Sequence, residues 1–233
     1  MIFWRLILAH LLIDFTFQTN FIAEWKRRNV WGALLHSMMF LVVGTILCWG
    51  YLTDIWVMAG NNMVIIQGWM ALVLLTIFHF MEDEWRVWTI QKLNSPDTMF
   101  FFIWDQVIHI VFIFVLFPQS FGIHPEPWVL LAILFVLTTH FTTIFIYYLE
   151  KDVFGQTNVL VHDKYFSMIE RLITALALLL PGWWALSFLF VWIARAVISS
   201  FWRRPQGFTW TNIIVGNSMA ALFGFLARLV YYA

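Results

Sequence analysis

Residues 9–20 read AHLLIDFTFQTN, and they lie inside the first strongly apolar segment of the chain. His10, Asp14 and Gln18 follow one another at intervals of four residues, so on a helix they share one face. A charged or ionisable side chain at membrane depth costs at least ~2.5 kcal/mol unless it is paired or hydrated. We therefore expect this face to be turned away from lipid, toward a polar interior site.

The composition of the chain is typical of an integral membrane protein. Of the 233 residues, 62% are hydrophobic and only 11% are charged, which lies well outside the range of soluble domains. The thirteen basic and thirteen acidic residues balance each other, so nothing favours nucleic acid as a partner. The expected partner is the lipid bilayer, and the sequence leaves a further protein partner open.

Runs of about 20 apolar residues, the length of a helix that crosses the hydrocarbon core, predict an all-α fold. We expect a polytopic transmembrane helix bundle that forms a single domain over residues 1–233. Eight crossings are predicted, at residues 2–24, 30–52, 63–92, 98–117, 127–149, 164–181, 182–202 and 211–231. Only Pro181 and Gly182, a turn signal, separate the sixth from the seventh, so seven crossings are the alternative.

The distribution of basic residues predicts how the bundle is oriented, because Lys and Arg accumulate in cytoplasmic loops. With eight crossings, one side of the membrane receives Lys26, Arg27, Arg28, Arg86, Lys92, Lys151, Lys164, Arg203 and Arg204. The opposite loops, near residues 53–62, 118–126 and 181–182, contain no Lys or Arg. Both termini are therefore predicted to lie on the outer, periplasm-like side.

Several of the predicted spans contain a His and an Asp four residues apart. The pairs are His10 with Asp14, His79 with Asp83, and Asp105 with His109, and the second span adds His36. At this spacing an imidazole and a carboxylate can bind one divalent cation, or the carboxylate can orient the ring. With a rise of ~1.5 Å per residue, these residues can share a depth in the bundle. We expect them to assemble one His/Asp-rich site.

Other polar residues have simpler interpretations. His140 stands among threonines, which favours a hydrogen-bonded packing role. Glu82 and Glu84 point away from the face of Asp83 and are expected to be solvated. Glu170 and Arg171 are expected to form an internal ion pair that anchors the sixth helix to the others. Packing explains a single buried His well, but it rarely explains several intramembrane carboxylates.

The polar segments AHLLIDFTFQTNFIAEWKRR, LLHS, HFMED, WDQVIH and IERLITALALL resemble a family of bacterial and phage membrane proteins known as domain of unknown function 3307. The resemblance runs along nearly the whole chain and is strongest in its first half. It implies a multi-pass protein of the bacterial inner membrane. The polar positions that it carries over are His10, Asp14, Gln18, His36, His79, Asp83, Asp105, Gln106, His109, Glu170 and Arg171.

The family supplies no activity. More distantly, helices with the HxxxD pattern resemble membrane-bound metal-dependent hydrolases and zinc phospholipase-like all-α enzymes, an analogy at the level of the motif. The nucleophile-elbow, P-loop and HExxH patterns are missing, so the sequence favours neither a serine hydrolase, an NTPase nor a zincin.

The leading hypothesis is a membrane-embedded metal-dependent hydrolase that acts on a lipid, a phosphoester or another amphipathic substrate. A divalent ion, with zinc preferred, would lower the pKa of a bound water toward ~7 and stabilise developing negative charge. The expected metal ligands are His36, His79, Asp83, Asp105 and His109. His10 and Asp14 are expected to complete the shell or to act as the catalytic base.

Two further functions remain open. The same polar residues could form the ion path of a transporter or proton-coupled permease, although no inverted repeat is evident. Alternatively, the polar cluster could fix the helix register of a structural or partner-binding membrane subunit without catalytic activity.

Overall fold

The computed structural model describes residues 1–60, 64–118, 122, 124–155, 163–201 and 210–232. Nearly all of these residues are helical, which confirms the predicted all-α class. The chain divides into two compact units, Met1–Val129 and Leu130–Ala233. Arg203 and Arg204, which contribute to the predicted orientation, lie outside the described residues.

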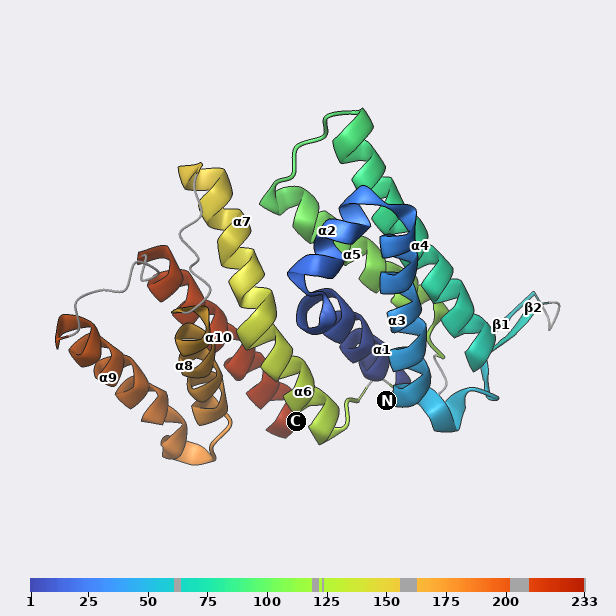
Figure 1. Ribbon diagram of the computed structural model, residues 1–233. Coiled ribbons are helices and arrows are strands. Elements are labelled where there is room, and N and C mark those ends of the chain that lie inside the picture. Colours follow the sequence, from blue (N-terminus) through green and yellow to red (C-terminus); the bar gives the residue numbers. More distant parts are fainter. Residues whose placement is uncertain (61–63, 119–121, 123, 156–162, 202–209, 233) are drawn as a thin grey trace. The chain divides into compact units, whose positions relative to one another are not determined.

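Helices α1 to α5 build the first unit (Figure 1). They are α1 (Ile2–Leu11), α2 (Asn20–Arg28), α3 (Val30–Cys48), α4 (Gly68–Lys92) and α5 (Met99–Leu116). The π-helical segment η1 (Leu12–Phe17) continues α1, and the short 3-10 turn η2 (Trp49–Tyr51) continues α3. Helix α3 packs against α1, α2 and α4, and α4 packs against α5.

The first predicted span, residues 2–24, is broken near its end. The chain leaves helical geometry at Gln18 and Thr19, and α2 then runs at 96° to the preceding helix. Thr19 caps α2, because its hydroxyl accepts a hydrogen bond from the backbone N–H of Ile22 at 3.3 Å. This bond satisfies one of the donors that the first turn of a helix leaves open. The sequence therefore predicts one helix where the structure has two, and the second folds back against α3.

Gly32, in the first turn of α3, permits this close return of α2. A Cβ atom at this position would lie 2.5 Å from the backbone nitrogen of Lys26 and 2.5 Å from the carbonyl carbon of Trp25. No side chain fits at that distance without moving the backbone of α2. The absence of a side chain at Gly32 therefore allows the backbone of Trp25 and Lys26 to lie directly against α3.

An antiparallel hairpin, which the sequence analysis did not predict, precedes α4 (Figure 1). Its strands are β1 (Ile55–Ala59) and β2 (Val64–Gln67), and Met58 lies opposite Ile65. The third predicted span begins at residue 63, but the chain is extended from Val64 to Gln67, and α4 begins only at Gly68. The β-branched run from Val64 to Ile66 favours a strand, which corrects the start of this span.

At the other end of α1, Arg5 links three segments of the first unit. Its guanidinium group forms an ion pair with Glu126 and donates a hydrogen bond to the carbonyl oxygen of Leu47 at 2.6 Å. The amino group of Met1 donates to the carbonyl oxygen of Gly122 at 3.0 Å. These contacts join the start of α1 to the end of α3 and to the segment after α5.

The second unit begins within α6 and contains the remaining helices. They are α6 (Pro127–Val136), the π-helical segment η4 (Leu137–Phe141), α7 (Thr142–Phe154), α8 (Asp163–Leu178), the 3-10 segment η5 (Gly182–Ser187), α9 (Phe188–Phe201) and α10 (Trp210–Tyr232). Its core includes Leu130, Leu134, Ala175 and Ala227. The buried guanidinium group of Arg171 donates to the hydroxyl of Thr143 at 2.8 Å. Arg171 thus joins α8 to α7, whereas the ion pair between Glu170 and Arg171 stays a prediction.

Eight membrane crossings are not supported by the part of the chain that the structure describes. Four helices are long and apolar enough to cross a membrane, namely Val30–Tyr51, Met99–Leu116, Pro127–Phe154 and Ile213–Tyr232, and the bent pair of α1–η1 with α2 raises the number to five. Helix α4 is long enough, but it carries Glu82, Asp83 and Glu84 within a few residues. Helices α8 and α9 have 16 and 14 residues, fewer than the ~20 that a span needs.

Candidate metal centre

The polar residues of the first four predicted spans converge inside the first unit. Asp14 comes from η1, His36 from α3, and His79 and Asp83 from one face of α4. All four side chains are at most 7% exposed. The spacing of four residues between His79 and Asp83 places both on the same side of α4, as predicted. We call these four residues, together with His10, the His–Asp cluster.

The donor atoms of the cluster are separated by similar distances. His36 Nε2 lies 3.2 Å from Asp14 Oδ1 and 3.7 Å from Asp83 Oδ2. His79 Nε2 lies 3.5 Å from Asp14 Oδ1 and 3.6 Å from Asp83 Oδ2. Two ligands bound at ~2.1 Å to one tetrahedral zinc ion are about 3.4 Å apart. The shortest separation is a hydrogen bond between His36 and Asp14, whereas the other three exceed the usual range of a hydrogen bond and are close to the edge of such a tetrahedron.

Two of these donor atoms lack a hydrogen bond. His79 Nε2 and Asp83 Oδ2 are buried, and each is without a hydrogen-bond partner among the described residues. A buried polar atom left in this way costs about 1–3 kcal/mol, and an ion is one of the partners that removes this cost. His36, His79 and Asp83 each offer one ligand atom, and these three atoms lie within 4.8 Å of one another.

A second group of donors shares His79 and includes His10 and Asp14 of the opening sequence motif. His10, Asp14 and His79 offer ligand atoms that also lie within 4.8 Å of one another. His10 Nδ1 is 3.8 Å from Asp14 Oδ1, so the π-helical geometry of η1 keeps the two side chains on one side. The cluster can therefore hold a cation at either of two neighbouring positions.

Gln106, on α5, determines which nitrogen of His10 carries the proton in the neutral ring. Its amide nitrogen donates to Asp14 Oδ2 at 3.2 Å and to Asp105 Oδ2 at 3.1 Å. Its oxygen is then the atom 3.1 Å from His10 Nε2, and because this oxygen only accepts, His10 Nε2 must donate. In a neutral His10, Nδ1 therefore presents its lone pair toward the carboxylate of Asp14. A cation between these two atoms would turn their repulsion into attraction.

Asp105 and His109, both predicted as metal ligands, lie beside the cluster and outside both donor groups. His109 Nδ1 donates to the backbone carbonyl of Asp105 at 2.9 Å, which leaves Nε2 as the nitrogen that carries the lone pair. The ring of His109 stacks on the ring of His10, with the two centroids 4.9 Å apart. It also packs edge-on against the ring of His79, with the centroids 4.4 Å apart. The structure thus places His109 against both donor groups, and Asp105 next to Gln106.

Lys26 is a member of the site that the sequence analysis missed. Its ammonium nitrogen lies 2.5 Å from Asp83 Oδ1, and its side chain is only 16% exposed. The sequence analysis assigned Lys26 to a cytoplasmic loop with Arg27 and Arg28. The available signal was the weak apolar character of residues 20–28, which indicates a separate short helix after the first span.

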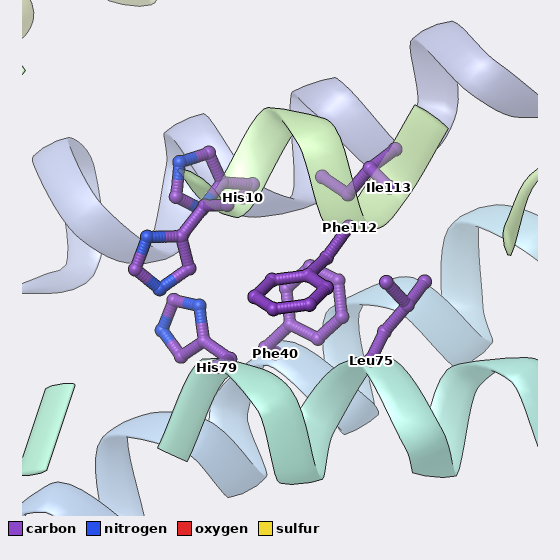
Figure 2. Close-up of a pocket in the computed structure, with 7 residues that line it drawn as sticks. His10, Phe40, Leu75, His79, Phe112 and Ile113 are labelled. Carbon is purple, nitrogen blue, oxygen red and sulfur yellow. The ribbon is translucent and has the colours of Figure 1, made fainter. Parts of the chain in front are cut away.

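A small pocket adjoins the cluster on the side away from Lys26. His10, His79 and His109 line one side of it, and Phe40, Leu75, Phe112 and Ile113 line the rest. Figure 2 shows the rings of His10 and His79 at one end of this pocket, with Phe112, Leu75 and Ile113 toward the other. The pocket therefore joins three imidazole rings to an apolar surface.

Other predicted polar positions do not reach the cluster. Gln18 ends η1, so it does not extend the face of His10 and Asp14 by another turn. Glu170 and Arg171 belong to the second unit. His140 also lies there, within η4, where its Nδ1 is 3.0 Å from the hydroxyl of Thr139, as expected for a packing role.

Comparison with known proteins identifies one family. The sequence model described as "Protein of unknown function (DUF3307)" matches residues 2–133. The match includes the whole His–Asp cluster, Lys26 and α5, but not Glu170 and Arg171, so it is shorter than the resemblance predicted from the sequence. No curated protein and no solved structure matches the chain.

Proposed function

The chain belongs to the DUF3307 family of proteins of unknown function, and on this premise we propose that it is a membrane-embedded, metal-dependent hydrolase. Its substrate is a lipid, a phosphoester or another amphipathic molecule. The divalent ion, with zinc preferred, binds at the His–Asp cluster. The observation that carries the proposal is the set of four N–O separations of 3.2–3.7 Å among His36, His79, Asp14 and Asp83.

The chemistry of the donors supports zinc. Imidazole nitrogen and carboxylate oxygen are both ordinary zinc ligands, and catalytic zinc sites combine three protein ligands with a fourth, open position. Each of the two donor groups supplies three ligands of these types. Gln106 holds the carboxylate of Asp14 and the ring of His10 in place, as outer hydrogen-bond partners do in metal sites.

The formal charges around the cluster also favour a divalent cation. Asp14, Asp83 and Asp105 carry three negative charges when ionised, and Lys26 carries one positive charge. Their sum leaves two negative charges in a buried site, and burying an uncompensated charge is strongly unfavourable. A single divalent cation would balance them.

The catalytic roles follow from the position of each group. A bound divalent ion supplies a polarised water and stabilises negative charge on the substrate. Where His36, His79 and Asp83 bind the ion, Asp14 lies within reach to accept a proton, and Gln106 keeps its carboxylate oriented. The small pocket beside His10, His79 and His109 has a volume of about 10 Å³, room for about one water molecule, and its apolar lining would exclude bulk water from the site.

The helix surfaces support a membrane location. Val42 and Ile46 on α3, and Val111 and Val115 on α5, are between 51% and 67% exposed. A water-soluble protein rarely exposes so much contiguous apolar surface. We place the chain in the bacterial inner membrane as a multi-pass protein, with Lys26–Arg28 at the cytoplasmic face. If the bent pair of α1–η1 with α2 crosses the membrane before Lys26, the N-terminus then lies on the periplasmic side.

Elemental analysis of the detergent-purified protein tests the metal site. We expect about one divalent ion or more per chain, and the loss of this metal in the His79→Ala variant, because His79 belongs to both donor groups and structural or catalytic ions depend on every ligand. His140→Ala is the matched control, since His140 lies outside both groups, and it should keep the metal. The metal-loaded protein should release phosphate from dodecyl phosphate, and the metal-stripped protein should not.

A correctly folded wild-type protein that contains no metal and takes up none from added zinc would contradict the proposal. Metal binding without any hydrolysis would favour a second candidate, a transporter or proton-coupled permease. The observation behind that candidate is the unbroken series of contacts from Lys26 through Asp83, His36 or His79, and Asp14 to His10, each shorter than 4 Å. Zinc or proton flux into liposomes would establish it.

A further inference from the structure

We propose that the small pocket beside the His–Asp cluster binds a single water molecule, that His109 holds this water, and that the proposed hydrolysis consumes it. The inference rests on the proposed function and assigns a further residue to the same site. His109 lies outside both groups of metal donors. Its role is therefore to bind the water and not the ion.

The pocket has the size of one water molecule. Its volume is about 10 Å³, close to the lower limit of the space that one buried water needs. Phe40, Leu75, Phe112 and Ile113 form its apolar walls, and three imidazole rings form the rest (Figure 2). A buried water also needs about two to four polar partners. In this pocket, the imidazole nitrogens are the side-chain atoms that can supply them.

Each of the three rings has one buried nitrogen without a hydrogen-bond partner among the described residues. These atoms are His10 Nδ1, His79 Nε2 and His109 Nε2. The rings come from three helices, α1, α4 and α5. The centroid of His109 lies 4.9 Å from that of His10 and 4.4 Å from that of His79. A single water can serve all three nitrogens, because a buried water typically makes about three hydrogen bonds.

The positions of the protons on the neutral rings suit a water that donates. Gln106 accepts from Nε2 of His10, which leaves a lone pair on Nδ1. The carbonyl oxygen of Asp105 accepts from Nδ1 of His109 at 2.9 Å, which leaves a lone pair on Nε2. These two nitrogens are both acceptors, so they cannot satisfy each other. A water between them donates one O–H group to each, and its oxygen stays open toward His79.

The pocket also borders one of the two possible ion positions. His10 and His79 line the pocket, and together with Asp14 they form one of the two donor groups. An ion held by these three ligands keeps a fourth, open position, as catalytic zinc does. The pocket lies beside two of the three ligands. The oxygen of the water would then face the ion, and one of its O–H groups would donate to His109.

Hydrolysis of a phosphoester consumes one such water. The oxygen of the water bonds to phosphorus while the bond from phosphorus to the alcohol oxygen breaks. The alcohol leaves with that electron pair and one proton of the water, and the other proton stays on the phosphate. The contribution of His109 is to hold the water in one orientation, which lowers the entropic part of the barrier. Its own ring is held by the hydrogen bond from Nδ1 to the backbone of α5.

Crystal structures of the full-length protein, one loaded with zinc and one stripped of metal, test the water site directly. We expect one ordered water in the pocket of both, about 2.7–3.2 Å from Nε2 of His109. In the zinc-loaded protein, the same water should also contact the ion. His109→Phe keeps an aromatic ring against His10 and His79 but removes Nε2, so this variant should hold no ordered water in the pocket.

The hydrolysis of dodecyl phosphate tests the role of the water. His109→Phe should lower kcat by about tenfold or more, as the loss of one hydrogen bond to the water predicts. Its zinc content and KM should stay unchanged, because His109 binds neither the ion nor the substrate. His109→Gln should restore most of kcat, since an amide oxygen can accept the same hydrogen bond. His140→Phe, the same exchange in the second unit, is the matched control and should behave like wild type.

Four results would overturn the inference. They are a pocket without water in both wild-type structures, direct coordination of zinc by His109, unchanged kcat in His109→Phe, and equal losses of kcat in His109→Phe and His109→Gln, which would assign His109 a packing role. Hydrolysis by a zinc-loaded protein whose pocket contains no water would refute this inference alone. A water at His109 in a protein that binds zinc but hydrolyses nothing would refute the proposed hydrolase and leave the water site in place.

Discussion

At the scale of single residues, the most informative side chain is Asp14. Its Oδ1 atom lies 3.2–3.8 Å from ring nitrogens of His10, His36 and His79, and its Oδ2 atom accepts from Gln106. A carboxylate surrounded by three imidazoles and an amide in this way is a good metal ligand or base. Asp105 differs, because its closest described partner in the site is the amide of Gln106.

This difference gives a prediction for a matched pair of substitutions. Asp14→Asn should reduce zinc affinity by more than about 100-fold, whereas Asp105→Asn should reduce it by less than about tenfold, the lower limit for outer hydrogen-bond partners of metal ligands. Zinc titration against a chelator of known affinity measures both changes. Equal losses in the two variants would show that Asp105 is itself a ligand, as the sequence analysis predicted.

At the scale of secondary-structure elements, the break after η1 shapes the site. A continuous first helix would carry Lys26 beyond the end of the bundle, since each residue adds ~1.5 Å. The 96° bend instead returns α2 to the start of α3, and the ammonium of Lys26 reaches Asp83. The contact between α2 and α3 depends on Gly32, where a Cβ atom would overlap backbone atoms of α2.

Gly32→Ala should therefore destabilise the protein by about 1–3 kcal/mol, as overpacking of a close contact does, and should lower the melting temperature in detergent. Gly50→Ala is the matched control, because a Cβ atom at Gly50 would meet nothing within 4 Å, and its melting temperature should stay near that of wild type. Thermal unfolding followed by circular dichroism compares the two. Equal melting temperatures for both variants would mean that α2 can move away from α3 without lowering the free energy of unfolding.

At the scale of the whole molecule, the proposed membrane orientation rests on the two ends of α3. Lys26, Arg27 and Arg28 precede α3, while η2 and the segment before β1 follow it and contain no Lys or Arg. Because Val30–Tyr51 is long and apolar enough to cross a membrane, these ends should lie on opposite sides. The family match ends at residue 133, close to the end of the first unit at Val129, so this unit contains most of the matched region and the whole site.

Cysteine labelling in intact bacterial cells tests this orientation. In a background in which the buried Cys48 is replaced by Ala, we expect Thr53→Cys to react with a membrane-impermeant maleimide from the periplasmic side. Arg28→Cys should react only after the inner membrane is opened, because basic residues stay in the cytoplasm. The reverse pattern would invert the proposed topology.

The sequence predicted most of the site because intramembrane acids and imidazoles are costly unless they meet a partner. His10, Asp14, His36, His79 and Asp83 could be assigned to one site from their spacing and depth alone, and the structure brings them together. The sequence could not separate Asp105 and His109 from these donors, because residues on one helix face share a direction but not a distance. Gln106 was carried over by resemblance, and its bridging hydrogen bonds emerge only from the coordinates.

Some features of the fold likewise follow from local sequence, and others depend on contacts between distant residues. Composition and apolar runs by themselves determined that the protein is helical and suited to a membrane, because hydropathy is a local property of the chain. The return of α2, the hairpin before α4 and the contact between Lys26 and Asp83 were decided only by tertiary structure. Each of these depends on contacts between separate elements, such as Gly32 against the backbone of α2. A local sequence pattern does not reveal such a close approach.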